Sequence, residues 1–429
     1  MSATRPTGWN ESVFRHPEFR RLMLANACST LAGRGLAVVV GYQVYEFSKS
    51  PLALGLLGLV EAVPALSLAL YGGHVADRSD RRSILRTTLG ALVVCAASFA
   101  LLTLNAGGSA TLPLLYGVVF IAGIARGFAA PAAAALEAQI VPRDLLVQSS
   151  SWLSAAWLGC AVVGPVLAGL SFSYLGPSAT YLGIASLYAA AGLCVLGIAP
   201  RPPIPRADTE SVWASIAAGI RYVARDQVLV GSMALDLFAV LFGGAIALLP
   251  LFAEDVLGVD AFGLGCLNAA PAVGALATML LATQRPPVRH AGRNLLLSVA
   301  GFGVAMIAFA LAENFYLSLL ALAAAGAFDG VSVVIRKSIL RLMSPDNMRG
   351  RIAAISFIFI GSSNELGALE SGLAAAWLGP QRSVWAGGLV TLLVVALAAA
   401  LAPRLRGLRL DPTQAAARDA KSDDELERA

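Results

Sequence analysis

Four ionisable side chains lie inside long apolar runs, where a charge is costly. They are Arg34, Arg126, Asp236 and Asp329. A charge at the centre of a lone membrane helix costs at least about 2.5–3.5 kcal/mol, so such residues usually mark a substrate or ion pathway. Carboxylates exchange protons and guanidinium groups bind anions, so these four are candidates for a substrate and proton pathway. The alternative is a set of static ion pairs that hold helices together.

Other polar residues in apolar runs extend this candidate pathway. They are Glu61, Asn364, Glu365 and Glu370, with Asn364 a candidate partner for Glu365. The alternative for the three acids is a structural role as buried hydrogen-bonding groups.

Enzymatic chemistry has no comparable support. The three histidines lie near loops, the five cysteines lie singly without a C-x-x-C pair, and no G-x-x-x-x-G-K-[ST] phosphate loop is found. We therefore expect no enzyme, no metal, no cofactor and no ATP-driven step.

The composition is that of a membrane protein, with 57% hydrophobic and 13% charged residues and a mean hydropathy of +0.73. About 20 apolar residues cross a bilayer core as a helix. The sequence predicts an all-α protein with twelve transmembrane helices, approximately at Leu22–Tyr45, Leu52–Tyr71, Ile84–Leu104, Leu112–Leu136, Ser150–Leu175, Ala179–Ile198, Val228–Phe252, Gly263–Ala282, Asn294–Ala312, Phe315–Ile335, Ile352–Leu378 and Val384–Ala402.

The positive charges predict the orientation. Most of the 31 Lys and Arg residues lie in the terminal segments and in every second gap between helices, including Arg336 after the tenth; the other side has only Lys49 and Arg382. Positive residues stay on the cytoplasmic side, so both termini are predicted there. The net charge of +5 reflects this topology and not nucleic-acid binding.

The same pattern divides the chain. We expect a cytoplasmic N-terminus (residues 1–21), a six-helix bundle (22–199), a cytoplasmic linker (200–227), a second six-helix bundle (228–402) and a disordered cytoplasmic tail (403–429). In the linker, one helical face carries Trp213, Ile216, Ala217, Ile220 and Val223. This spacing predicts an amphipathic helix at the membrane surface.

An internal repeat relates the two predicted bundles. At an offset of 203 residues, "GIARG" at 123–127 aligns with "GAFDG" at 326–330, and Gly164 and Gly169 align with Gly367 and Gly372. A constant offset indicates two pseudo-symmetric six-helix bundles related by an axis along the membrane normal, with a substrate site near the midplane.

The loop after the second predicted helix, "GGHVADRSDRR", resembles the major facilitator signature G-x-L-A-D-R-x-G-R-R/K. Gly73, Ala76, Asp77, Arg78, Arg81 and Arg82 match, whereas Asp80 replaces the usual Gly. The segment 328–373 resembles the bacterial enterobactin-exporter and drug-efflux branch of that superfamily. The superfamily resemblance extends from Leu22 to about Ala402.

The resemblance implies roles for several residues. Asp77 would latch the start of the eleventh helix in one state, and Arg81 would bridge Asp77 to Glu137. The first, fourth, seventh and tenth helices would line a central cavity. From their equivalent positions in the repeat, we further predict that Arg126 and Asp329 face this cavity and interact directly or through a bound anion. Gly159, Gly164, Pro165 and Gly169 resemble the antiporter motif of the superfamily; the alternative is ordinary small-residue packing.

Together these features predict a monomeric, proton-coupled exporter in the bacterial cytoplasmic membrane. Its substrate would be an amphipathic or anionic small molecule such as a siderophore or a drug. Two alternatives are a proton- or sodium-coupled importer of a small carboxylate, and a receptor or assembly subunit that has lost transport. The charges inside the helices argue against the last alternative, because a static scaffold does not need them.

Overall fold

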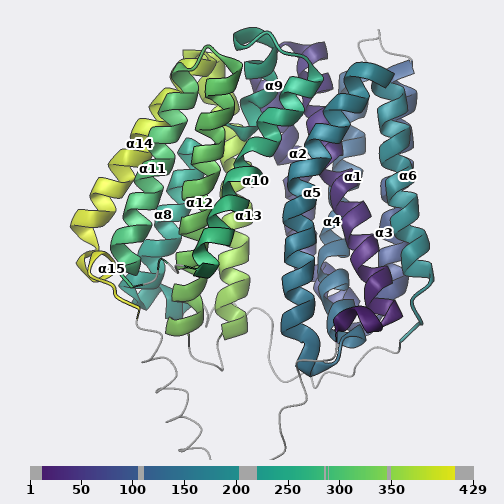
Figure 1. Cartoon of the computed structure of the whole chain (residues 1–429). Helices are drawn as coiled ribbons and strands as arrows, with labels where there is room; N and C mark the ends of the chain where they lie inside the picture. The colour runs from purple at the N-terminus through teal and green to yellow at the C-terminus, as the bar shows by residue number, and fades with distance from the viewer. Residues whose placement is uncertain are drawn as a thin grey trace, which may run out of the picture. The chain divides into compact units, whose positions relative to one another are not determined.

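The structure is a computed structural model that describes residues 12–104, 111–201, 220–284, 287, 289–344 and 349–410. The side chains of some residues within these ranges, including that of Asp77, lie outside the description. The N-terminal 11 residues, most of the predicted linker helix and the tail from residue 411 also lie outside it; in the linker, residues 220–225 are helical. All regular elements in the described ranges are helical (Figure 1).

The chain forms two compact units. The first comprises Met1–Ala207 together with Ile246–Ala269, and the second comprises Asp208–Ala245 and Ala270–Ala429. A short segment from the middle of the chain is therefore part of the first unit.

Six long helices build most of the first unit. They and the short elements of this unit are η1 (Val13–Arg15), α1 (Pro17–Ser48), α2 (Pro51–Arg78), α3 (Arg81–Leu104), α4 (Thr111–Ile140), η2 (Arg143–Leu145), α5 (Leu146–Leu175), α6 (Pro177–Leu196), η3 (Ile246–Leu248), α9 (Leu249–Leu251), the π-helix η4 (Phe252–Val256) and the start of α10 (Ala261–Gln284). Proline begins α1, α2 and α6, where its missing N–H is harmless.

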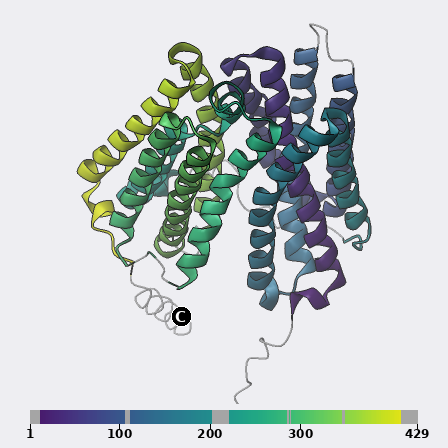
Figure 2. The same cartoon turned by 45° about the horizontal axis from the view of Figure 1, so that its top comes forward.

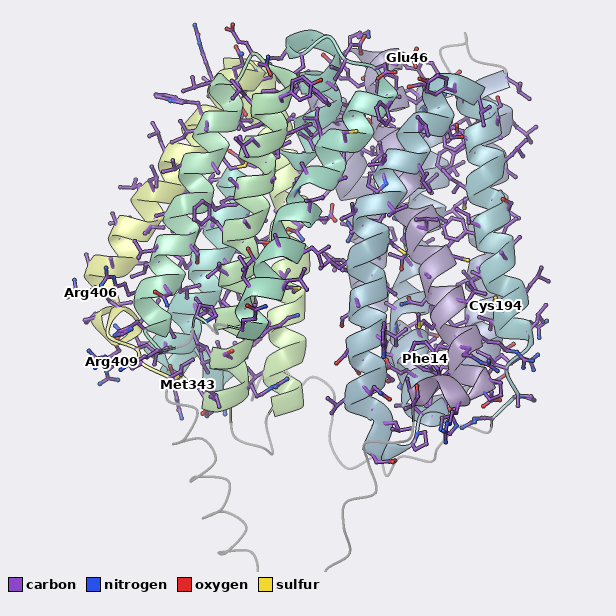
Figure 3. All side chains as sticks on the ribbon, in the orientation of Figure 1. Phe14, Glu46, Cys194, Met343, Arg406 and Arg409 are labelled. Atoms are coloured by element: carbon purple, nitrogen blue, oxygen red, sulfur yellow. The ribbon has the colours of Figure 1, made fainter. Side chains whose placement is uncertain are left out.

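Helix α1 packs against α5 and α6, and α3 packs against α4 and α6 (Figures 1 and 2). Tyr181 of α6 is fully buried, stacks on Phe99 of α3 and donates a 2.7 Å hydrogen bond to the Gln43 side chain of α1. A buried hydroxyl in an apolar bundle needs such a partner. Glu46 and Phe14 mark opposite ends of this unit (Figure 3).

The second unit contains α8 (Gln227–Gly243), the rest of α10, α11 (Ala291–Leu311), α12 (Phe315–Met343), α13 (Arg349–Leu378), α14 (Pro380–Leu401) and α15 (Pro403–Arg406). Helix α11 packs against α12 and α14, and α8 packs against α13 and α14 (Figure 1).

Eleven helical spans of the described chain are long and apolar enough to cross a membrane. Helix α13, which is 30 residues long, corresponds to the remaining predicted span, Ile352–Leu378. The predicted all-α membrane fold is confirmed.

Three predicted helices differ from the structure. The second, predicted to end at Tyr71, continues to Arg78, so most of the segment predicted as a signature loop is helical. The seventh, predicted as continuous, ends as α8 at Gly243 and resumes after Gly244 as short 3₁₀, α and π segments. Gly244 is extended, with φ −83° and ψ 96°, and the break follows two successive glycines. The tenth, predicted to end at Ile335, continues to Met343. Arg336 therefore lies within α12 and not after its end, and its guanidinium forms an ion pair with Asp236 of α8.

The glycines of the repeat perform the same packing task in both units. A Cβ atom on Gly123 or Gly127 of α4 would collide with or crowd the α2 backbone at Glu61 and Ala65. On α12, a Cβ on Gly326 would strike the carbonyl oxygen of Pro271 in α10. Close helix approach through glycine is typical of membrane bundles.

Candidate substrate and coupling sites

A cluster of charges lies inside the second unit. The Arg336 guanidinium forms an ion pair with the Asp236 carboxylate of α8 through Nη1, and its Nη2 is 3.6 Å from Asp329 Oδ1. Its Nε donates a 3.1 Å hydrogen bond to Ser332 Oγ. Asp329, Ser332 and Arg336 follow one another at i, i+3 and i+7, which places them on one face of α12. Arg336 is thus the shared counterion of Asp236 and Asp329.

Exposure distinguishes the two acids. The Asp236 and Arg336 side chains are 8% and 11% exposed, whereas that of Asp329 is 46% exposed. The buried pair lines a small pocket with Ser232, Ser356 and Phe359. With both carboxylates ionised, the cluster carries one negative charge in excess. Uptake of one proton would remove this excess, and Asp329 is the more exposed of the two acids.

A second cluster, in the first unit, has the opposite balance. Arg126 of α4 forms an ion pair with Glu61 of α2. On α1, the guanidinium carbon of Arg34 is 4.7 Å from the centre of the Trp157 ring of α5. Within the described part of the chain, Arg34 has no acidic partner. Two arginines and one glutamate therefore leave one positive charge in excess.

The packing of α1 brings the two arginines close together. A Cβ atom on Gly33 would lie 3.9 Å from Arg126 Nη2 and 3.4 Å from the Tyr188 hydroxyl. A Cβ on Gly164 of α5 would touch the Arg34 Cβ at 3.0 Å. Arg34 remains exposed beside the half-exposed Trp157. An arginine deep in a span needs water or an anion at its exposed face, so this face is suited to bind an anionic group.

The structure provides counterions that the sequence analysis did not assign. Arg126 pairs with Glu61, and Asp236 pairs with Arg336, each within one unit. The predicted interaction of Arg126 with Asp329 stays a prediction, since these residues belong to different units. Arg336 was not among the predicted site residues, because the helix was expected to end at Ile335. The i, i+3, i+7 spacing from Asp329 was the available signal.

The structure does not show a substrate or proton role for the three predicted polar residues of α13, Asn364, Glu365 and Glu370. Asn364 is exposed, whereas Glu365 and Glu370 are partly buried. Next to Glu370, Ser371 donates a 3.0 Å hydrogen bond to the Gly244 carbonyl oxygen at the break after α8. The role of this group in a substrate or proton pathway stays a prediction.

The signature segment lies mostly in the last turns of α2, which ends at Arg78, and is held by helix packing and capping. A Cβ on Gly72 would strike the Gly127 carbonyl oxygen at 2.7 Å, whereas Gly73 has open space. Asp80, the departure from the signature, accepts a 3.2 Å hydrogen bond from the Arg82 N–H just inside the start of α3, as an N-cap side chain does. Asp80 is therefore accommodated at the usual glycine position of the signature because its side chain caps the start of α3.

The loop arginines and Glu137 also have identified partners. Arg82 donates to the last carbonyls of α6, at 3.3 Å to Val195 and 2.6 Å to Leu196. Arg81 is buried and donates a 3.2 Å bond to Ala76 O, and Arg78 is exposed. Glu137 accepts bonds from the Ser149 and Ser150 hydroxyls. The latch through Asp77 and the Arg81–Glu137 bridge stay predictions.

The antiporter-like residues pack α5 against two helices. Gly164 faces α1, and a Cβ on Gly169 would collide with the Ala261 carbonyl oxygen at the start of α10. In return, Gly265 of α10 faces the Pro165 carbonyl oxygen. Gly159 has open space around it. Three of the four residues thus serve close packing, and a transport role for them stays a prediction.

Polar contacts between the end of α1 and η4 were not predicted from the sequence. At the end of α1, the Tyr45 hydroxyl donates to Asp255, and Lys49 pairs with Glu254. Both acids lie on the π-helix η4. Lys49, the C-cap of α1, has φ 48°. The two α1 residues are four positions apart and so lie on one face, where they hold η4 against α1 (Glu46 labels this end in Figure 3).

Replacing Tyr45 with phenylalanine is expected to loosen η4. A hydrogen bond to a charged group contributes about 1.5–3 kcal/mol, so amide hydrogen exchange across Phe252–Val256 should become about 10- to 100-fold faster. Tyr42→Phe is the matched control, because Tyr42 lies one turn earlier and makes a ring contact with Phe172. Equal exchange rates in the two variants would contradict the assigned role of the Tyr45 hydroxyl.

Comparison with known proteins identifies the family. Residues 9–425 match the model of the MFS_3 family, described as transmembrane secretion effectors. The chain belongs to this family. It is a multi-pass membrane protein and a secondary transporter of the major facilitator superfamily, not an enzyme, and so acts on a small-molecule substrate within a lipid bilayer.

Similar proteins agree with the MFS_3 assignment. The chain is 28% identical over 415 residues to enterobactin exporter EntS of Shigella boydii serotype 18, covering 94% of this chain and 96% of the relative. EntS of Escherichia coli O81 gives the same values. Among solved structures, a bacterial homolog of the lysosomal transporter Spinster, inward-facing and unoccupied, has a TM-score of 0.73 at 15% identity, covering 94% of this chain and 100% of that one. A D-xylose–proton symporter has a TM-score of 0.68 at 16% identity and coverages of 91% and 99%.

Proposed function

We propose that this protein exports an amphipathic or anionic small molecule from the cytoplasm in exchange for protons. The observation that carries the proposal is the cluster in which Asp236 and Asp329 share Arg336. Two acids around one base hold a negative charge that a single proton removes. The exposed Asp329 takes up the proton, while Asp236 keeps Arg336 neutralised.

In this proposal, the first unit binds the anionic group of the substrate. Arg34 has no acidic partner in the described chain, and its charge is available to an anionic group of the substrate. Trp157 beside it offers an apolar surface. In this proposal, substrate and proton are bound by different groups.

The direction of transport is inferred from the family description and from similar proteins. The family description names secretion, and the relatives at 28% identity are enterobactin exporters. We extend export to this chain and place it in the cytoplasmic membrane, with both termini in the cytoplasm. Enterobactin is therefore the first probe, and a hydrophobic drug such as ethidium is the second.

Inside-out vesicles containing the purified protein test the proposal. An acidic lumen should drive uptake of the transported probe, and Asp329→Asn should abolish this dependence while leaving probe binding intact. Glu313→Gln is the control, because Glu313 is exposed and lies outside the cluster at the start of α12. Uptake that ignores the pH gradient, or that follows a sodium gradient alone, would refute proton exchange.

A further inference from the structure

Five arginines form a basic patch at one end of the second unit. Two flank the start of α11 and three belong to α15 and the residues after it; they are Arg289, Arg293, Arg404, Arg406 and Arg409. All five are exposed, and none forms a salt bridge with an acid of the described chain. Arg406 and Arg409 lie at the same end of the unit as Met343 (Figure 3).

The fold holds this patch in place. Leu405 is fully buried and Leu410 is 7% exposed, so the arginines alternate with buried leucines. Gly292 of α11 lies directly against the Leu405 carbonyl oxygen, where a Cβ would collide, and its N–H donates a 3.1 Å bond to Leu408 O. Gln227 of α8 donates a 3.1 Å bond to Leu401 O. The segment from Ala402 to Leu410 is therefore a docked part of the unit.

Such a patch has an unbalanced charge. Like charges held close together repel one another unless an anion lies between them. Asp226, which precedes the Gln227 that bonds to Leu401, already caps α8 by accepting bonds from the Val228 and Leu229 N–H groups at 2.8 and 3.1 Å. The structure thus provides a fixed, multiply charged cationic surface without a protein counterion in its described part.

The surroundings indicate which anion fits. Leu397 and Leu401, on the last turns of α14 beside α15, are 49% and 74% exposed. A ligand that presents phosphate to the arginines and hydrocarbon to these leucines satisfies both surfaces. Basic clusters beside the ends of membrane helices attract anionic lipids in this way.

We propose that the basic patch is a binding site for the phosphate headgroups of anionic phospholipids. In the predicted orientation it faces the cytoplasmic leaflet. Headgroups bound here bridge α15 to the start of α11 and so hold the end of the second unit together. This inference is independent of the proposed export function, because it concerns lipid and not the transported substrate.

Lipid titration of the purified full-length protein tests the site. In neutral detergent, short-chain phosphatidylglycerol should raise the unfolding temperature of the wild-type protein, whereas phosphatidylcholine should not. Combined Arg404→Gln, Arg406→Gln and Arg409→Gln substitutions should weaken the apparent affinity for phosphatidylglycerol at least tenfold. Arg382→Gln is the matched control, since Arg382 is an exposed arginine at the opposite end of α14.

A second variant tests whether binding depends on the docked position of the arginines and not only on their charge. Gly292→Leu keeps all five arginines but displaces the Leu405 backbone, and should also weaken phosphatidylglycerol binding about tenfold. Unchanged affinity in the triple variant, or equal losses in Arg382→Gln, would overturn the proposal. Stabilisation by inorganic phosphate at the same concentration would overturn it as well, because it would identify a site for soluble anions.

Discussion

Replacing Arg336 with glutamine is expected to destabilise the protein by about 3–5 kcal/mol and to abolish proton-coupled transport. Removing one partner of a buried ion pair leaves an uncompensated charge, here the Asp236 carboxylate, whose side chain is 8% exposed. Unfolding in detergent measures the stability loss. This loss should shrink as the pH falls, because a protonated Asp236 no longer leaves a buried charge without a partner.

The double variant Asp236→Asn with Arg336→Gln separates stability from function. Two neutral side chains of similar size can bond to each other, so most of the lost stability should return. Transport driven by the pH gradient should stay absent, because the shared guanidinium is missing. Lys337→Gln is the control at the adjacent, exposed position. Additive losses in the double variant, or transport by Arg336→Gln, would contradict the coupling role of this cluster.

The fold was largely predictable from the sequence, because the bilayer requires long apolar runs that are visible without any structure. The predicted Ile84–Leu104 span corresponds to α3 (Arg81–Leu104), and Ile352–Leu378 corresponds to α13 (Arg349–Leu378). The break after Gly243 was not predicted. Its signal was a glycine pair inside an otherwise apolar run, a pattern that also occurs in continuous membrane helices.

The candidate site was only half predictable, for a physical reason. Asp236 and Asp329 stand out in apolar sequence, whereas Arg336 lies where a helix end and a cytoplasmic loop look alike. Whether a helix continues past such a residue depends on a partner on another helix, and Asp236 on α8 is far away in the chain. For the same reason, Tyr45 and Lys49 gave no signal of their contacts with η4.

Arg34→Gln is expected to weaken binding of the transported anion by about 10- to 100-fold. A charge-assisted hydrogen bond contributes about 1.5–3 kcal/mol, and each 1.4 kcal/mol is a factor of ten in affinity. Arg34→Lys should recover part of the affinity, since lysine keeps the charge but not the planar group that stacks on Trp157. Equilibrium binding to the detergent-solubilised protein measures the effect with the compound that the vesicle assay identifies.

The stability of the Arg34 variants distinguishes a substrate-binding role of Arg34 from a structural role. Arg34 has no acidic partner in the described chain, so Arg34→Gln leaves no carboxylate without a counterion and should change unfolding by less than about 1 kcal/mol. Arg126→Gln, by contrast, deprives Glu61 of its partner and should destabilise the protein. Arg86→Gln, an exposed change on α3, is the control for the loss of a positive charge elsewhere on the protein.

Two outcomes would contradict the prediction. Full affinity in Arg34→Gln would remove Arg34 from the substrate site. A stability loss like that of Arg126→Gln would instead make Arg34 a structural cation.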